Sequence, residues 1–221
     1  MIETEETKKN IEERLDGFPS GGYGRYEYDS YGNLCKEAFY DLNGNLVYNE
    51  KLYCMVVSVS DKNGNVEKIA YLGQDEKPCC CADGYASARM SYDSDGNLIL
   101  AEFLGLCDEP VVSREYGAHK VAFAYDKAGN NVECRLYDVD GKMDSAGDFS
   151  VVTYGYEDCN MVSVSFYDAA AQPALTSYGV HRIVLDYDRD GNCIRRAAYD
   201  CQGNPAVYYD GIHMFEYEYE E

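Results

Sequence analysis

The sequence lacks tryptophan, has few cations and contains no apolar run long enough to span a membrane. Its 19 lysine and arginine residues stand against 40 aspartate and glutamate residues, a formal net charge of −21 at pH 7. Binding to nucleic-acid phosphates requires the opposite sign of charge. Residues 1–6 have neither the basic start nor the apolar stretch of a secretory signal peptide. These absences predict a protein with no membrane span and no nucleic-acid partner.

Ten cysteines occur without the Cys-x-x-Cys spacing that is typical of zinc and redox sites. We expect them to be free thiols in a reducing compartment, which predicts a cytoplasmic protein. The alternative is a secreted or cell-surface protein whose targeting segment lies outside this sequence.

A tandem repeat of 31–33 residues accounts for nearly the whole chain. Its anchor, most often a tyrosine, occurs at positions 28, 60, 92, 125, 156, 187 and 219. The motif Asp-x-x-Gly-Asn follows five of these anchors, at residues 29–33, 61–65, 93–97, 126–130 and 188–192. A sixth copy, at residues 156–160, is one residue short.

The motif has the chemistry of a β-hairpin turn. The aspartate caps backbone N–H groups, and the glycine supplies the left-handed conformation that lets the return strand pair through a bulge. The predicted turn glycines are Gly32, Gly64, Gly96, Gly129 and Gly191. A looser second turn follows in each repeat, and Pro78, Pro110, Pro173 and Pro205 come just after it. Because proline cannot donate to a β-ladder, we expect this variable third segment to be an extended edge or crossover.

The residues that flank the turns alternate between apolar and polar, as in half-buried strands. The sequence therefore predicts an all-β fold, a tandem array of antiparallel β-hairpin repeats. Residues 20–219 would form six to seven repeats in one continuous domain. Residues 1–19 would form a cap with a short helix over residues 2–16, because acidic residues precede Ile11 and Leu15, which are four apart.

Nine Tyr-Asp dipeptides and the Tyr-Asp-x-x-Gly step make residues 20–219 similar to the YD repeats of Rhs-type and teneurin-like proteins. The chain also resembles the related MORN-variant and WG-type β-hairpin repeats of bacteria. The resemblance implies strings of antiparallel hairpins that form extended sheets, coils or shells. Such arrays encapsulate, scaffold or bind, and they carry no catalytic residues.

Two metal-site hypotheses arise from the repeats. Asp-x-Asp-Gly-Asn, at residues 93–97 and 188–192, is similar to the opening of a calcium loop, but the later ligands are missing and the second aspartate is not kept in the other copies. His119, His181 and His213 share one position in the repeat, six residues before an anchor. We interpret the aspartates as structural turn residues and the histidines as partly buried side chains bonded to backbone carbonyls. No metal or other cofactor is expected.

No catalytic motif interrupts the repeats, so the sequence predicts a protein that is not an enzyme. The first hypothesis is a scaffold or protein-binding module, whose partner is another protein or further repeats of the parent chain. The alternatives are a cell-surface carbohydrate-binding module and an acidic nucleic-acid mimic that acts as an inhibitor. The repeat pattern explains the anchor tyrosines as packing residues. It does not require the tyrosines of the third segments, which are the candidate binding surface: Tyr48, Tyr116, Tyr178, Tyr208 and Tyr209.

Overall fold

The computed structural model describes residues 10–14, 22–143, 149–207 and 211–219, and all regular secondary structure in these ranges is β-strand. None of the described segments forms a helix that could cross a membrane. The chain divides into two compact units, Met1–Glu115 and Tyr116–Glu221. The all-β fold predicted from the repeats is confirmed.

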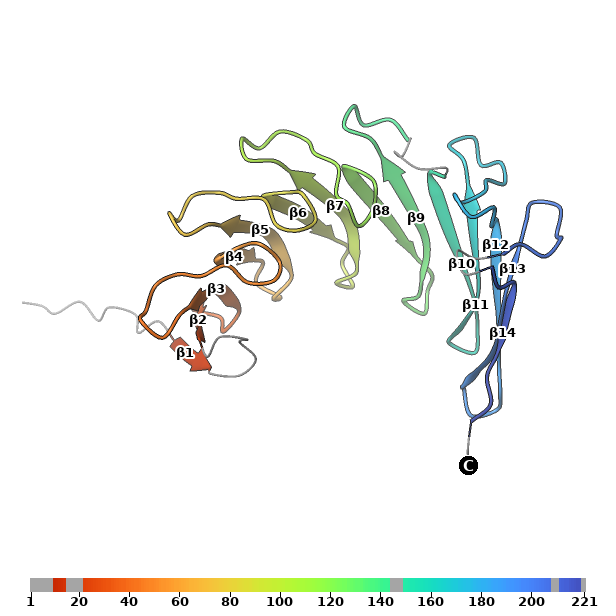
Figure 1. Cartoon of the computed structure of the whole chain (residues 1–221), viewed down its shortest axis with the longest axis horizontal. Coiled ribbons are helices and arrows are strands. Elements are labelled where there is room, and N and C mark those ends of the chain that lie inside the picture. The colour runs from red at the N-terminus through yellow and green to blue at the C-terminus, as the bar shows by residue number, and fades with distance from the viewer. Residues whose placement is uncertain (1–9, 15–21, 144–148, 208–210, 220–221) are drawn as a thin grey trace, which may run out of the picture. The chain divides into compact units, whose positions relative to one another are not determined.

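The first unit is an antiparallel meander in which each strand pairs with the next along the chain (Figure 1). Its strands are β1 (Asn10–Arg14), β2 (Tyr23–Tyr28), β3 (Leu34–Tyr40), β4 (Met55–Ser60), β5 (Val66–Leu72), β6 (Ser87–Tyr92) and β7 (Leu98–Leu104).

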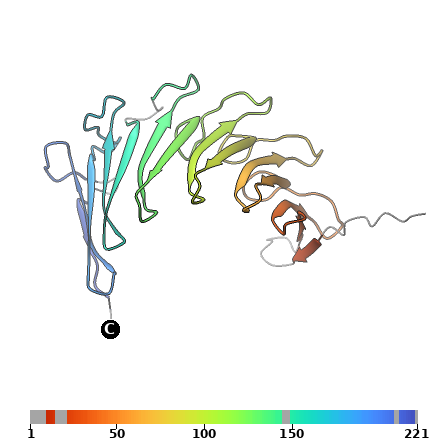
Figure 2. The same cartoon turned by 180° about the vertical axis from the view of Figure 1, so that it is seen from behind.

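The second unit repeats the same meander, which Figure 2 shows from behind. Its strands are β8 (Lys120–Tyr125), β9 (Asn131–Tyr137), β10 (Val151–Glu157), β11 (Asn160–Tyr167), β12 (Arg182–Tyr187), β13 (Cys193–Tyr199) and β14 (Met214–Glu216).

The expected N-terminal helix is wrong for residues 10–14, which form strand β1. This strand pairs with β2 along its whole length, from Asn10 opposite Tyr28 to Arg14 opposite Gly24. Pairing gives the backbone groups of β2 partners that a helix cannot supply, and this gain outweighs a weak helical pattern. The other residues of the expected helix lie outside the described ranges.

Each long hairpin contains the turn and the bulge that the motif requires. The turn glycines have φ values from 84° to 90° at Gly32, Gly64, Gly96, Gly129 and Gly191. A register shift occurs just before the anchor in all six of these hairpins, for example between Ser91 and Tyr92. In the short copy, Asp158 and Cys159 both have positive φ and form a two-residue hairpin loop. One residue fewer therefore changes the type of turn and keeps the hairpin.

The second turns keep the same backbone hydrogen bonds but not always a glycine. The left-handed position is Gly44, Gly141 and Gly203 in three repeats, and it is Glu76, Asp108 and Ala171 in the other three. A side chain with a Cβ atom is strained in this conformation. These three positions therefore hold stored backbone strain.

Replacing Ala171 by glycine should release that strain. Ala171 is exposed and has φ 58°, so the change removes no packing, and the free energy of unfolding should rise by about 1 kcal/mol. Urea denaturation measures the change. The neighbouring Ala170→Gly is the control: it lies outside the left-handed region and should not stabilise the protein. Equal effects of the two substitutions would contradict the assignment.

The core of the first unit is a continuous stack of aromatic rings. Ring centroids are 5.9 Å apart for Phe39–Tyr53, 4.6 Å for Tyr53–Tyr71, 5.7 Å for Tyr71–Tyr85 and 4.8 Å for Tyr85–Phe103. Second strands and third segments contribute alternately, so each ring from a third segment bridges two hairpins. This arrangement makes the stack the main apolar contact between repeats of this unit.

The second unit keeps one such ring contact, Phe149–Phe166 at 4.8 Å, and has aliphatic side chains at other core positions. Val180 and Ala206, from the third segments, pack with Ala198 of β13, and Phe166 and Ile183 lie against them. The positions therefore stay buried in the second unit, but not all of them hold an aromatic side chain.

The third segments are also joined to one another by polar contacts. In the first unit the N–H of Ala82 donates to the carbonyl of Lys51 at 2.8 Å, and the N–H of Arg114 donates to the carbonyl of Asp83 at 2.9 Å. Each of the four third-segment prolines makes an isolated β-bridge to the end of the preceding strand, as between Leu72 and Pro78. The third segment is thus an extended crossover, as its proline predicts.

Candidate functional site

The turn carboxylates recur along the repeats, and they accept hydrogen bonds from their own turns. In the turn at residues 93–97, the N–H groups of Asp95 and Asn97 each donate to Oδ1 of Asp93 at 2.9 Å. The side-chain amide of Asn97 donates to Oδ2 of Asp93, also at 2.9 Å. These hydrogen bonds, led by that of the amide, lower the pKa of Asp93. The asparagine of the motif therefore has a structural role as the partner of the aspartate.

This arrangement leaves little room for calcium in the turns. Both carboxylate oxygens of Asp93 already accept hydrogen bonds, and the same contacts recur at Asp188. Among the described residues, no group of three or more His, Cys, Asp or Glu side chains is placed to hold a metal ion. A calcium ion would have to compete with these hydrogen bonds for the same carboxylate oxygens.

Chelation should therefore leave the stability of the protein unchanged. We expect the same melting temperature in EDTA and in millimolar calcium, because a ligand stabilises the native state only if it binds there. Differential scanning calorimetry tests this. A rise of several degrees in calcium would support the calcium interpretation of Asp93–Asp95 and Asp188–Asp190 instead.

Two grooves lie between neighbouring turns at equivalent positions of the two units. One, of about 570 Å³, is lined by Asp61, Glu67, Asp93 and Asp95. The other, of about 450 Å³, is lined by Glu157, Asp158, Asp186 and Asp188, with Arg182 as its one cation. Their charge disfavours anionic ligands.

Three anchor tyrosines each bond to the preceding hairpin. The hydroxyl groups of Tyr92, Tyr187 and Tyr219 donate to the carbonyls of Val66, Met161 and Cys193, each at 2.9 Å and each 26 residues earlier. The interpretation of the anchors as packing residues is confirmed for Tyr92 and Tyr187.

The shared histidine position has the role expected for His181. Nδ1 of His181 lies 2.8 Å from the carbonyl oxygen of Phe166 and 3.3 Å from that of Ala174. The ring packs edge-on against Tyr167. His213 packs in the same way against Tyr199, but its buried Nδ1 has no hydrogen-bond partner among the described residues.

Three of the five predicted binding tyrosines are exposed, and the other two, Tyr208 and Tyr209, lie outside the described residues. The exposed fractions are 52% for Tyr48, 36% for Tyr116 and 54% for Tyr178. The hydroxyl of Tyr48 lies over Gly73, where a Cβ atom would be 2.9 Å from it. Tyr48 therefore also packs against the second turn of the next repeat.

The sequence analysis named only Tyr48 from a recurring set of exposed side chains on the third segments. In the three segments of the first unit the row consists of Tyr48, Cys80 and Val112; in the second unit Leu175 and Val207 take the same position. Each of these residues except Tyr48 is the second residue after a third-segment proline. The residue between is at least partly buried, as Cys79 and Ala206 are, so the pattern Pro-buried-exposed was the signal. We call these residues, taken within each unit, the third-segment row.

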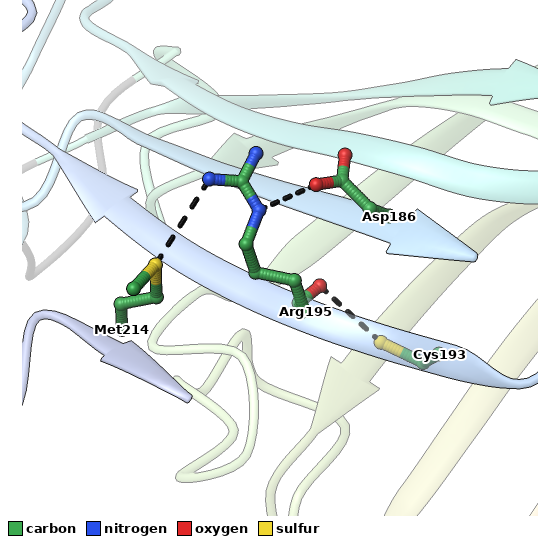
Figure 3. Close-up of polar contacts among 4 residues, drawn as sticks. All are labelled: Asp186, Cys193, Arg195 and Met214. Atoms are coloured by element: carbon green, nitrogen blue, oxygen red, sulfur yellow. Dashed lines mark hydrogen bonds and ion pairs between the residues drawn. The ribbon is translucent and has the colours of Figure 1, made fainter. Parts of the chain in front are cut away.

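In two hairpins the residue before the anchor forms an ion pair with the residue opposite it on the second strand. Asp186, the residue before the anchor Tyr187, pairs with Arg195 directly opposite on β13, with Nε of Arg195 2.5 Å from Oδ2 of Asp186. Figure 3 shows Arg195 between Asp186 of β12 and Met214 of β14, whose sulfur lies 3.9 Å from Nη1. Glu27 and Lys36 form the same pair in the first hairpin, at 3.3 Å.

No protein-family model matches the sequence, and no curated protein matches it. Among solved structures, the chain is similar to a crystal structure of TcdB2-TccC3 without its hypervariable C-terminal region. The identity is 11% and the TM-score 0.45, over 85% of this chain and 10% of that one. It is also similar to the Photorhabdus luminescens Tc holotoxin pore, with 11% identity and a TM-score of 0.41, over 80% of this chain and 9% of that one. The chain thus spans about a tenth of the length of these proteins.

Proposed function

We propose that this chain is a non-enzymatic scaffold of β-hairpin repeats that binds a protein partner through the third-segment row. The observation that carries the proposal is the exposure of this row in every described third segment in which the position is visible. Most other recurring groups are used within the fold: turn carboxylates accept hydrogen bonds from their own turns, and anchor hydroxyls donate to the preceding hairpin. Exposed apolar side chains in a repeated position are typical of a protein-interaction surface.

Site-specific photocrosslinking tests the proposal. A benzophenone amino acid at Tyr48 should give a discrete adduct with one protein in cells of the source organism, and Val112→Asp in the same chain should abolish it. The control position is Tyr31, which is exposed at a turn tip outside the row. Equal adducts from Tyr31 and Tyr48 would contradict the proposal.

Two further assays separate the alternatives. Binding to a defined sugar on a glycan array, lost on Tyr178→Ala, would favour the carbohydrate-binding alternative. Release of a DNA-binding protein from its operator by this chain would favour the nucleic-acid mimic.

A further inference from the structure

The cations of strands β2 to β7 all lie on one face of the first unit. Directly opposite residues of a sheet share a face, and the registers connect the four positions from strand to strand. Tyr71 and Phe103 of the aromatic stack lie on the other face, together with the third segments that supply the intervening rings. The four cations are Arg25, Lys36, Lys68 and Arg89.

Two of these cations are already engaged within the fold. Lys36 forms an ion pair with Glu27 at 3.3 Å, and the guanidinium carbon of Arg25 lies 5.0 Å from the ring centroid of Tyr40. The ammonium group of Lys68, in contrast, forms no hydrogen bond or ion pair within the described part of the chain. This is unexpected in a chain with 40 acidic and 19 basic residues.

Lys68 and Arg89 stand directly opposite each other on β5 and β6. In the registers of the described strands within each unit, this is the one place where two like charges are opposed. Across its own hairpin Lys68 faces Val59, whereas Lys36 and Arg195, at the equivalent position, face acids. Like charges placed in this way repel and lower stability. The arrangement therefore favours a role in binding over a role in folding.

The surroundings leave this pair open to a partner. Arg89 reaches Asp108 at 3.8 Å, but the two side chains are 53% and 63% exposed, and an exposed ion pair of this kind contributes little. Val59, beside Lys68, is 58% exposed. Neither cation lines the acidic groove of this unit. The site thus consists of two cations next to an exposed apolar side chain.

This composition indicates the chemistry of the ligand. The Cβ atoms of directly opposite residues are about 5 Å apart, so one carboxylate can accept hydrogen bonds from both Lys68 and Arg89. Val59 gives an apolar side chain of the ligand a surface to cover. A long polyanion such as a nucleic acid is disfavoured by the net charge of −21, which repels it at every other part of the chain.

We propose that Lys68 and Arg89 bind a short acidic segment of another protein, with an aspartate or glutamate between the two cations and an apolar side chain on Val59. The cations supply specificity for the carboxylate, and removal of their mutual repulsion adds to the free energy of binding. This site shares no residue with the third-segment row, so either proposal can fail without the other.

Peptide selection on the full chain tests the inference. The probe is a phage-displayed library of random nonapeptides, and the most enriched sequence is then made as a fluorescent peptide. We expect enriched sequences to place an acid beside an apolar residue. Lys68→Glu should weaken binding of the fluorescent peptide by at least tenfold, and Lys68→Arg should retain it. Lys62→Glu, at an exposed turn tip of the same hairpin, changes the net charge equally and should leave binding unchanged.

Thermal unfolding of the same variants separates a binding role from a structural one. Lys68→Glu replaces repulsion with attraction to Arg89, so the melting temperature should rise by about 2 °C while binding is lost. Lys62→Glu has no cation opposite it and should not raise the melting temperature.

Four results would overturn the inference. They are the enrichment of no peptide or of peptides without acids, equal binding to the wild type and Lys68→Glu, equal losses for Lys68→Glu and Lys62→Glu, and a melting temperature that falls in Lys68→Glu. Dimerisation of the wild type that Lys68→Glu abolishes would also overturn it, since the occupant would then be a second copy. Tighter Lys68-dependent binding of polyphosphate than of the peptide would replace the protein partner with a phosphate polymer.

Discussion

Tyr85→Ala is expected to lower the free energy of unfolding by about 3–5 kcal/mol, the usual cost of removing a large buried ring. Tyr85 is buried and its ring contacts both Tyr71 of β5 and Phe103 of β7. Its loss would interrupt the aromatic stack between two hairpins, leaving a cavity that backbone pairing alone cannot close. Urea denaturation followed by circular dichroism measures the change.

Two matched variants make the result specific. Tyr85→Phe keeps the ring and removes the hydroxyl that interacts with Tyr71, so it should cost about 1 kcal/mol. Tyr31→Ala removes an exposed ring at a turn tip and should change stability by less than about 0.5 kcal/mol. A loss below about 1 kcal/mol for Tyr85→Ala would show that the stack is not the main contact between the repeats.

Sequence alone predicted the parts of the fold that depend on local chemistry. The positive φ of Gly96 belongs to a turn in which Asp93 accepts hydrogen bonds from the backbone and the side-chain amide of Asn97. The residues of the turn therefore suffice to specify it. The role of Tyr187 followed from its constant spacing, because a residue kept at one place in each repeat must meet an equivalent neighbour.

The parts that sequence analysis missed depend on contacts across the repeats. Strand β1 forms because β2 has an open edge, which no pattern within residues 10–14 reveals. Two second turns without the usual aspartate looked irregular in sequence, yet they are capped by Asp75 and by Glu109, whose carboxylates reach the turn from other positions. Tyrosine was also too narrow a criterion for the candidate surface, since position after the proline, as at Val112, determines exposure.

Acidification below about pH 4 is expected to destabilise the protein, because aspartates of the unfolded chain take up protons near that pH while the turn aspartates of the folded chain resist protonation. In Asp93, Asp126 and Asp188 the side-chain amide of the following asparagine, helped by backbone N–H groups, lowers the pKa in the folded state. The same direction holds for Asp29, Asp41, Asp61, Asp75 and Asp200.

The sign of the effect follows from proton linkage. A carboxyl group with a lower pKa in the folded state releases its proton more readily there, so the unfolded chain binds more protons in acid. The stabilisation is complete above the unfolded pKa and is lost as the pH falls through the folded values. Eight such groups act in one direction, so their contributions add although each carboxylate is exposed to solvent.

The net charge of −21 predicts the opposite pH dependence, so the experiment can distinguish the two effects. Repulsion among carboxylates weakens as they are protonated, which by itself would make the protein more stable in acid. Salt at about 0.15 M screens exposed charges beyond about 8 Å but not the hydrogen bonds within a turn, so urea midpoints at pH 7, 5, 4 and 3 in that salt isolate the turn contribution. Asp93→Asn should reduce the loss between pH 5 and pH 3, whereas Asp95→Asn, whose carboxylate makes no hydrogen bond among the described residues, should leave the loss close to that of the wild type. A urea midpoint that rises on acidification would mean that charge repulsion, and not turn capping, controls the stability of the repeats.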